Sequence, residues 1–108
     1  MWLHNIRGIK SKIDSLKDKI DEVGPDVVCI TETHLIDDDK IELEGYKIFR
    51  NNRDNFGGGI LVAVRTKLKN ICTVVEKGLN VGETLWIVID NGRIKVRMGV
   101  IYVVQNNV

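Results

Sequence analysis

The chain has one proline, two cysteines and 6% aromatic residues among its 108 residues, and it lacks any long apolar run. No run approaches the roughly 20 apolar residues of a membrane span. No basic region precedes a long apolar stretch at the start, so a signal peptide is not indicated. Two cysteines do not indicate a disulfide framework, and we interpret Cys29 and Cys72, both in apolar runs, as reduced core residues. We therefore expect an intracellular protein, cytoplasmic or nuclear.

The chain also lacks a large excess of positive or negative charge. Sixteen Lys and Arg residues and fifteen Asp and Glu residues leave a net charge of +1. Any attraction to nucleic acid must therefore come from a local patch. With 44% apolar and 29% charged residues, the composition is that of a globular protein, and residues 1–108 predict one domain with one core.

One amphipathic helix is predicted near the start. Its apolar residues recur at steps of four, three, four and three. Ser11 and Asp14 resemble a capping box at the helix start, and Gly24 and Pro25 predict its end. A short coiled coil has the same spacing, but a buried strand follows at once, which favours a helix packed on a sheet. The apolar stripe consists of Ile9, Ile13, Leu16, Ile20 and Val23.

Short apolar or alternating runs predict the strands. A short strand ends at Asn5, and the others are expected at 27–30, 46–50, 60–65, 71–75, 85–89 and 94–104. Asn91-Gly92 between the last two is a strong hairpin signal. A βαβ unit followed by antiparallel hairpins predicts one mixed β-sheet, in an α+β or α/β arrangement.

Asn5 and Glu32 are the strongest candidate site residues. Each follows an apolar strand, and two strands joined by a helix are expected to be parallel. Both side chains would then lie at the carboxyl edge of the sheet, where open α/β sheets bind ligands. An amide and a carboxylate suit Mg²⁺ or Mn²⁺, which take oxygen ligands and keep several waters. The alternative is a hydrogen-bonded strand end beside a solvated carboxylate.

Other polar features have plainer interpretations. His34 is a possible general base, but a histidine in a polar loop is more often a surface residue. Residues 37–39, all aspartate, lack the spacing of a calcium loop and predict a solvated turn. Residues 57–59, all glycine, lack the helix start of a phosphate-binding loop and predict a turn, with or without a bulge, that enters a strand.

Cationic residues gather in the middle third of the chain. Arg50, Arg53 and Arg65 are candidate contacts to a nucleic-acid backbone, and scattered solvated charges explain them equally well. Tyr102, near the end of the last strand, is a core residue with a wet hydroxyl unless its strand end meets Asn5 and Glu32.

Taken in order, several segments resemble the amino-terminal half of the endonuclease/exonuclease/phosphatase superfamily. The likeness is strongest to the apurinic-like endonuclease domains of non-LTR retrotransposons, and it runs over nearly the whole chain. The segments that carry it are Asn5-Ile6-Arg7-Gly8-Ile9, residues 25–35 with Ile30-Thr31-Glu32-Thr33-His34, residues 45–50, residues 57–62 and Val100-Ile101-Tyr102.

The resemblance implies half of a deoxyribonuclease I-like four-layer α/β sandwich and magnesium-dependent (or manganese-dependent) hydrolysis of phosphodiesters in DNA. It makes Glu32 a metal ligand and Asn5 a supporting residue that positions Glu32. It gives Tyr102 either a hydrogen bond to the scissile phosphate or a part in steadying the attack on it. Many relatives carry an acidic residue where Arg7 stands. The family's second half, with its water-orienting segment and its Asp-His pair, has no counterpart here.

The resemblance therefore predicts a truncated relative that is weak or inactive alone. In the parent fold one sheet face packs on a partner sheet, so we expect an exposed apolar face on which two copies pair as a twofold homodimer. The alternative is a non-enzymatic homodimerising or nucleic-acid-binding module.

Overall fold

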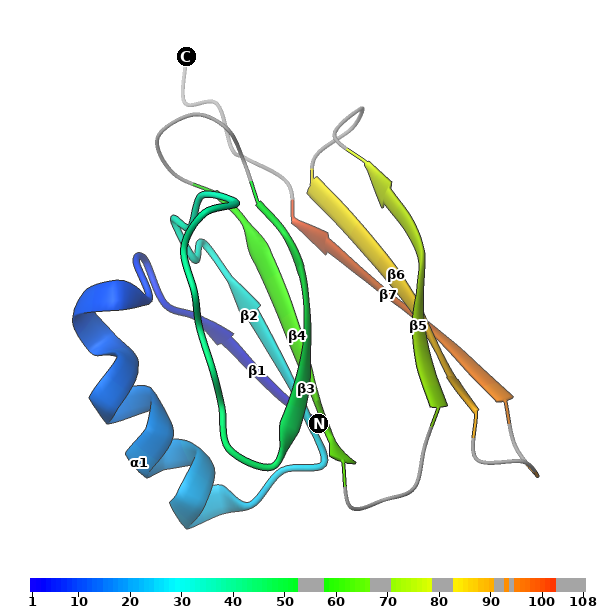
Figure 1. Cartoon of the computed structure of the whole chain (residues 1–108), viewed down its shortest axis with the longest axis horizontal. Helices are drawn as coiled ribbons and strands as arrows, with labels where there is room; N and C mark the ends of the chain where they lie inside the picture. The colour runs from blue at the N-terminus through cyan, green and yellow to red at the C-terminus, as the bar shows by residue number, and fades with distance from the viewer. Residues whose placement is uncertain (53–57, 67–70, 79–82, 91–92, 94, 103–108) are drawn as a thin grey trace.

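A computed structural model describes residues 1–52, 58–66, 71–78, 83–90, 93 and 95–102, with 71–78 and 83 described by their backbone alone. A helix and two β-sheets are stacked in three layers (Figure 1). In chain order the elements are β1 (Trp2–Asn5), the 3-10 helix η1 (Lys10–Lys12), α1 (Ile13–Val23), β2 (Val27–Thr31), β3 (Tyr46–Asn51), β4 (Ile60–Arg65), β5 (Ile71–Gly78), β6 (Glu83–Asp90) and β7 (Lys95–Tyr102).

The strands are divided between two sheets, which corrects the expectation of a single mixed sheet. Sheet A has the order β1-β2-β4-β3 and is mixed, with β1 and β2 parallel and the other pairs antiparallel. Sheet B has the order β5-β6-β7 and is antiparallel throughout. Alternation of side chains predicts that a segment is a strand, but it does not say which sheet the strand joins. The single-sheet prediction was wrong for that reason.

The predicted βαβ start is confirmed. The chain leaves β1, forms α1 on one face of sheet A and returns as β2 beside β1. Gly24 ends the helix in the left-handed conformation, with φ of 62°, and its N–H donates to the Ile20 carbonyl at 2.8 Å. The predicted capping box is absent, because Ser11 lies inside η1 and no side chain caps either η1 or α1.

The first core lies between α1 and sheet A. Leu16 and Ile20 of the predicted helical stripe pack on Val28 and Ile30 of β2. Full burial of one such side chain contributes about 1.5–3 kcal/mol, so this face fixes the helix on the sheet. The other buried members of the cluster are Ile6, Ile9, Leu35, Leu43, Leu61 and Ala63.

The second core lies between the two sheets. Phe49 and Val62 on the far face of sheet A pack against Leu85, Ile87 and Val100 of sheet B. Sheet B therefore covers the sheet A face that was expected to be exposed and to pair with a second copy. The packing argument for a homodimer through that face does not hold, and homodimerisation itself stays a prediction.

Cys29 of β2 belongs to the core between the sheets and is a free thiol, as expected. Burial raises the pKa of its thiol, an effect that the positive amino terminus partly offsets. The side chain of Cys72 lies outside the described residues. In the described part of the chain, no helix is long and apolar enough to cross a membrane.

The hairpin of β6 and β7 is confirmed by its register, from Asp90 opposite Lys95 to Glu83 opposite Tyr102. Its Asn91-Gly92 turn lies outside the described residues. Side chains alternate along β7, since Met98, Val100 and Tyr102 face sheet A. On the opposite face, the Arg97 guanidinium lies 5.3 Å from the centre of the Trp86 ring.

Candidate functional site

The ends of β1 and β2 lie side by side at one edge of sheet A. Asn5 is opposite Thr31 in the parallel register. Beyond it the loop after β1 keeps contact with β2, because the N–H groups of Ile6 and Gly8 donate to the carbonyls of Thr31 and Glu32 at 3.1 and 2.8 Å. The backbones of Asn5 and Glu32 therefore leave the sheet one residue apart at its carboxyl edge. This is the backbone arrangement that the βαβ pattern predicts.

Glu32 occupies an unusual backbone conformation. Its φ is 56°, and that of His34 is 57°, both in the left-handed region that residues other than glycine rarely adopt. Between them Thr33 is fully buried. The segment is fixed on its other side by Gly58 and Gly59, whose carbonyls accept from the N–H groups of His34 and Thr33 at 2.8 and 3.3 Å. Such conformations cost about 1–3 kcal/mol each and persist where the surrounding contacts determine them.

The charge beside Glu32 is positive. The Arg7 Nε lies 4.0 Å from Oε2 of Glu32, with the Arg7 side chain 81% exposed and that of Glu32 22% exposed. Lys12 reaches back from η1 and donates from Nζ to the carbonyl of Ile6 at 2.6 Å and, more distantly, to that of Arg7 at 3.4 Å. Two cations, Arg7 and Lys12, therefore lie in or against the loop that follows Asn5.

The residues at this edge fit a divalent cation that keeps most of its ligands as water. Glu32 offers a partly exposed carboxylate whose cationic neighbour is Arg7, and Asn5 offers an exposed amide oxygen. Within the described residues no group of three or more His, Cys, Asp or Glu side chains is arranged to hold a metal. Magnesium usually takes only one or two protein carboxylates, with waters and substrate phosphate completing its octahedron. Among the described residues, Glu32 and Asn5 are the candidate oxygen ligands at this edge.

Tyr102 is the last residue of β7. Figure 1 shows that β7 ends at the same end of the molecule as the loops that follow β1 and β2. The Tyr102 side chain is partly buried and packs against the core between the sheets. Sheet B is tied to β3 at this end, because Nδ2 of buried Asn51 donates to the Thr84 carbonyl at 2.8 Å. Asn51 therefore helps to set where the end of β7 lies.

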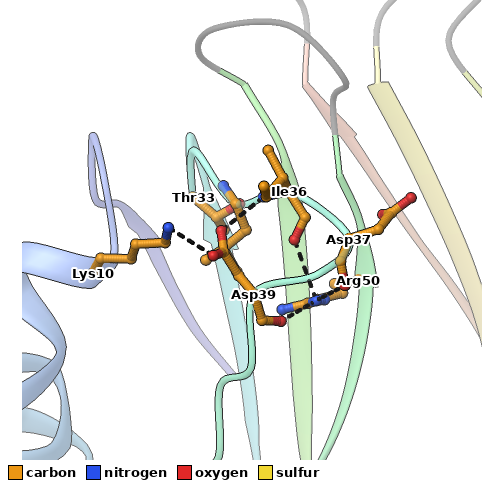
Figure 2. Close-up of polar contacts among 7 residues, drawn as sticks. Lys10, Thr33, Ile36, Asp37, Asp39 and Arg50 are labelled. Atoms are coloured by element: carbon orange, nitrogen blue, oxygen red, sulfur yellow. Dashed lines mark hydrogen bonds and ion pairs between the residues drawn. The ribbon is translucent and has the colours of Figure 1, made fainter.

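The three-aspartate loop is more ordered than a solvated turn. Asp37 and Asp38 are exposed as expected, but Asp39 forms an ion pair with Lys10 at 2.6 Å and accepts from the Ile36 N–H at 2.9 Å (Figure 2). The hydrogen bond from Lys10, above all, holds the pKa of Asp39 below the usual carboxyl range, with a further contribution from the Ile36 N–H. The loop is thereby tied to the turn that precedes α1.

The three candidate nucleic-acid contacts are dispersed. The Arg50 guanidinium donates to the carbonyls of Asp37 and Asp39, at 3.1 and 2.5 Å, and so holds the same loop (Figure 2). Arg65 lies at the end of β4, where its Nη2 donates to the Pro25 carbonyl at 3.1 Å, so it is next to the start of β2 and not to the carboxyl end of that strand. Arg53 lies outside the described residues. Contact of these arginines with nucleic acid stays a prediction.

Two glycines proved more important than the sequence indicated. Gly58 and Gly59 have φ of 72° and 98°, and a β-carbon on Gly59 would lie 2.3 Å from Oγ1 of Thr33. From the sequence, the run of three glycines predicts only a turn that enters a strand, and Gly57 is outside the described residues. His34 is exposed, as expected for a loop histidine, and lies near Gly8. Lys12 and Asn51 carried no signal, because lysine on a helix and asparagine in a polar stretch are common on surfaces.

Residues 3–106 match the profile of the Endonuclease/Exonuclease/phosphatase family. Among curated proteins, none matches this chain. The family match begins at the second residue of β1 and continues past the end of β7.

Proposed function

This chain belongs to the Endonuclease/Exonuclease/phosphatase family, and from that membership we propose that it carries the metal-binding side of a magnesium-dependent endonuclease that hydrolyses phosphodiesters in DNA. Membership indicates hydrolysis of the nuclease or phosphatase type. The proposal further assigns the chain to the apurinic-like endonucleases of non-LTR retrotransposons, and it predicts weak or no activity for these 108 residues alone.

One observation carries the proposal. Asn5 and Glu32 end neighbouring parallel strands, and Glu32 is fixed in a costly left-handed conformation by contacts on both sides. Strain of this kind concentrates at functional sites. A packing role does not explain it, because the side chain is a partly exposed carboxylate. A role as a metal ligand explains the strained backbone, because a ligand carboxylate must face the solvent at the carboxyl ends of β1 and β2.

Each residue has a separate part in the proposed reaction. Glu32 and Asn5 would hold Mg²⁺ or Mn²⁺, which supplies positive charge to the phosphate when bound. Tyr102, at the end of β7, would donate a hydrogen bond from its hydroxyl group to a phosphate oxygen. The buried contacts of Thr33 and of Asn51 would orient Glu32 and sheet B before substrate arrives.

Activation of water is the step that these residues lack. Hydrolysis needs a general base in line with the leaving oxygen. In the described part of the chain, neither histidine is hydrogen-bonded to a carboxylate. His4 is stacked on Trp2, with ring centres 5.3 Å apart, and His34 is exposed. Loss of the groups that act together on the nucleophile costs many orders of magnitude in rate, so we expect binding of metal with little turnover.

Binding of Mn²⁺, followed by the electron paramagnetic resonance of the free ion, tests the metal site directly. Glu32→Gln keeps the size of the side chain and removes its charge, so it should abolish the binding seen in the unmodified protein. Glu22→Gln on the exposed face of α1 makes the same charge change away from the site and should leave binding intact. Equal Mn²⁺ binding by Glu32→Gln and the unmodified protein would overturn the proposal.

Nicking of supercoiled plasmid tests the activity. Any cleavage should require Mg²⁺ and disappear in Glu32→Gln, whereas cleavage that persists in this variant comes from a contaminant. Salt-dependent DNA binding that is unaffected by Glu32→Gln and reduced by Arg50→Ala, with no metal bound, would instead indicate the non-enzymatic nucleic-acid-binding module.

A further inference from the structure

We propose that Arg7 has two roles at this site: it neutralises Glu32 when no divalent cation is bound, and it binds a substrate phosphate when the cation takes Glu32. The inference rests on the proposed function and extends it. Its starting point is the distance of 4.0 Å between Nε of Arg7 and Oε2 of Glu32.

The backbone keeps Arg7 beside Glu32. The Gly8 N–H is bonded to the Glu32 carbonyl and the Ile9 N–H to the Thr33 carbonyl, at 2.8 and 3.0 Å. Lys12 binds the Ile6 and Arg7 carbonyls from the other side of the loop. Arg7 itself has φ of 51°, so its backbone is set in the left-handed region by these contacts. Its position does not depend on the ion pair with Glu32.

The side chain, by contrast, is free to change partner. Its 81% exposure and the long 4.0 Å separation describe a weak, solvent-screened pair. The pair uses Nε, and within the described residues the two terminal amino groups have no protein partner. A guanidinium presents these groups as a fork that matches two phosphate oxygens. Arg7 therefore has the exposure and the chemistry to bind a phosphodiester beside a metal on Glu32.

The arrangement implies competition. A divalent cation must displace Arg7 from Glu32, so the removal of the guanidinium should strengthen metal binding. Because exposed ion pairs are weak, we expect a gain of about two- to fivefold in Mn²⁺ affinity. The same change should weaken the binding of DNA phosphate in the presence of the metal, since one cationic contact is lost.

The metal arm of the test measures Mn²⁺ binding by the unmodified protein, Arg7→Gln and Lys19→Gln. Arg7→Gln keeps an unbranched side chain at the left-handed position, and its circular dichroism should match that of the unmodified protein. Lys19, on the exposed face of α1, is a control that loses the same charge far from Glu32. Tighter Mn²⁺ binding by Arg7→Gln than by Lys19→Gln supports the inference, and equal binding by the two variants overturns it.

The phosphate arm measures the binding of a fluorescein-labelled 12-base-pair duplex in EDTA. Glu32→Gln should tighten binding, because it removes a negative charge and releases Arg7. In an Arg7→Gln background the same substitution should tighten binding less, and this non-additivity is the signature of the pair. Equal effects in the two backgrounds overturn the inference. Failure of the proposed function is distinct, since there Glu32→Gln would leave Mn²⁺ binding unchanged.

Discussion

Gly59 lies so close to Thr33 that a β-carbon on the glycine would come within 2.3 Å of the threonine hydroxyl oxygen. Real β-carbons do not make contacts of this length, so only glycine allows β4 to begin where it does. Because the carbonyls of Gly58 and Gly59 bind the segment that follows Glu32, this contact also sets the conformation of the candidate ligand.

Gly59→Ala should therefore destabilise the protein more than an ordinary loop substitution. We expect a loss of about 2–4 kcal/mol in the free energy of unfolding, from the positive φ of 98° and the clash with buried Thr33. Gly45→Ala is the matched control, because Gly45 has φ of 82° with no atom within 4 Å of the added β-carbon. It should cost only about 1 kcal/mol. Urea unfolding measures both, and equal losses would show that the contact with Thr33 is unimportant.

The ion pair between Lys10 and Asp39 should make stability depend on pH in the acid range. Because the pKa of Asp39 is lowered in the folded protein, its contribution is fully present above the ordinary carboxyl pKa of about 4 and is lost as the pH falls through the lower folded value. Asp39→Asn should remove this part of the pH dependence. Unfolding midpoints measured between pH 2 and pH 7 test it, with Asp18→Asn on the exposed face of α1 as control. If the unfolding midpoint of Asp39→Asn depended on pH as that of the unmodified protein does, the acid-range dependence would not come from Asp39.

The helix and most strands could be predicted because their signals are local. The stripe that includes Leu16 and Ile20 fixes the buried face of α1, and Gly24 ends the helix in the conformation that favours glycine. The parallel pairing of β1 and β2 follows from the connecting helix, and with it the neighbouring positions of Asn5 and Glu32.

The predictions that failed concern features that depend on contacts between distant segments of the chain. Nothing in the pattern of β6 distinguishes a strand beside β4 from one packed across it, so the second sheet was missed. Ser11 matched a capping pattern, yet the chain forms a 3-10 turn there. The role of Gly59 required knowledge of Thr33, which is 26 residues earlier in the chain.

Asn51 should be necessary for the placement of sheet B at the site. Its side-chain amide donates to the Thr84 carbonyl of β6 from a buried position. Asn51→Ala should lower the free energy of unfolding by about 1–3 kcal/mol. It should also change the emission of Trp86 on β6, measured in a Trp2→Phe background. Asn52→Ala, which removes a more exposed hydrogen bond to Asp37, is the control and should leave that emission unchanged.

Arg65 should contribute to stability rather than to nucleic-acid binding. Its guanidinium donates to the Pro25 carbonyl at 3.1 Å and to the Tyr46 hydroxyl at 3.2 Å, and its Nε lies 3.7 Å from Asp26. These groups join the end of β4 to the start of β2 and of β3, and the Arg65 side chain is only 18% exposed. Few of its donors therefore face solvent, where a phosphate would approach.

Arg65→Ala should accordingly lower the free energy of unfolding by about 2–3 kcal/mol, because it leaves the Pro25 carbonyl without this partner. Arg65→Lys should also be destabilising, since an ammonium group cannot reach several acceptors as the planar guanidinium does. Affinity for a DNA duplex, measured where both variants are folded, should match that of Lys19→Ala. A loss of affinity in Arg65→Ala that Arg65→Lys restores, without a change in stability, would return Arg65 to the DNA-binding surface.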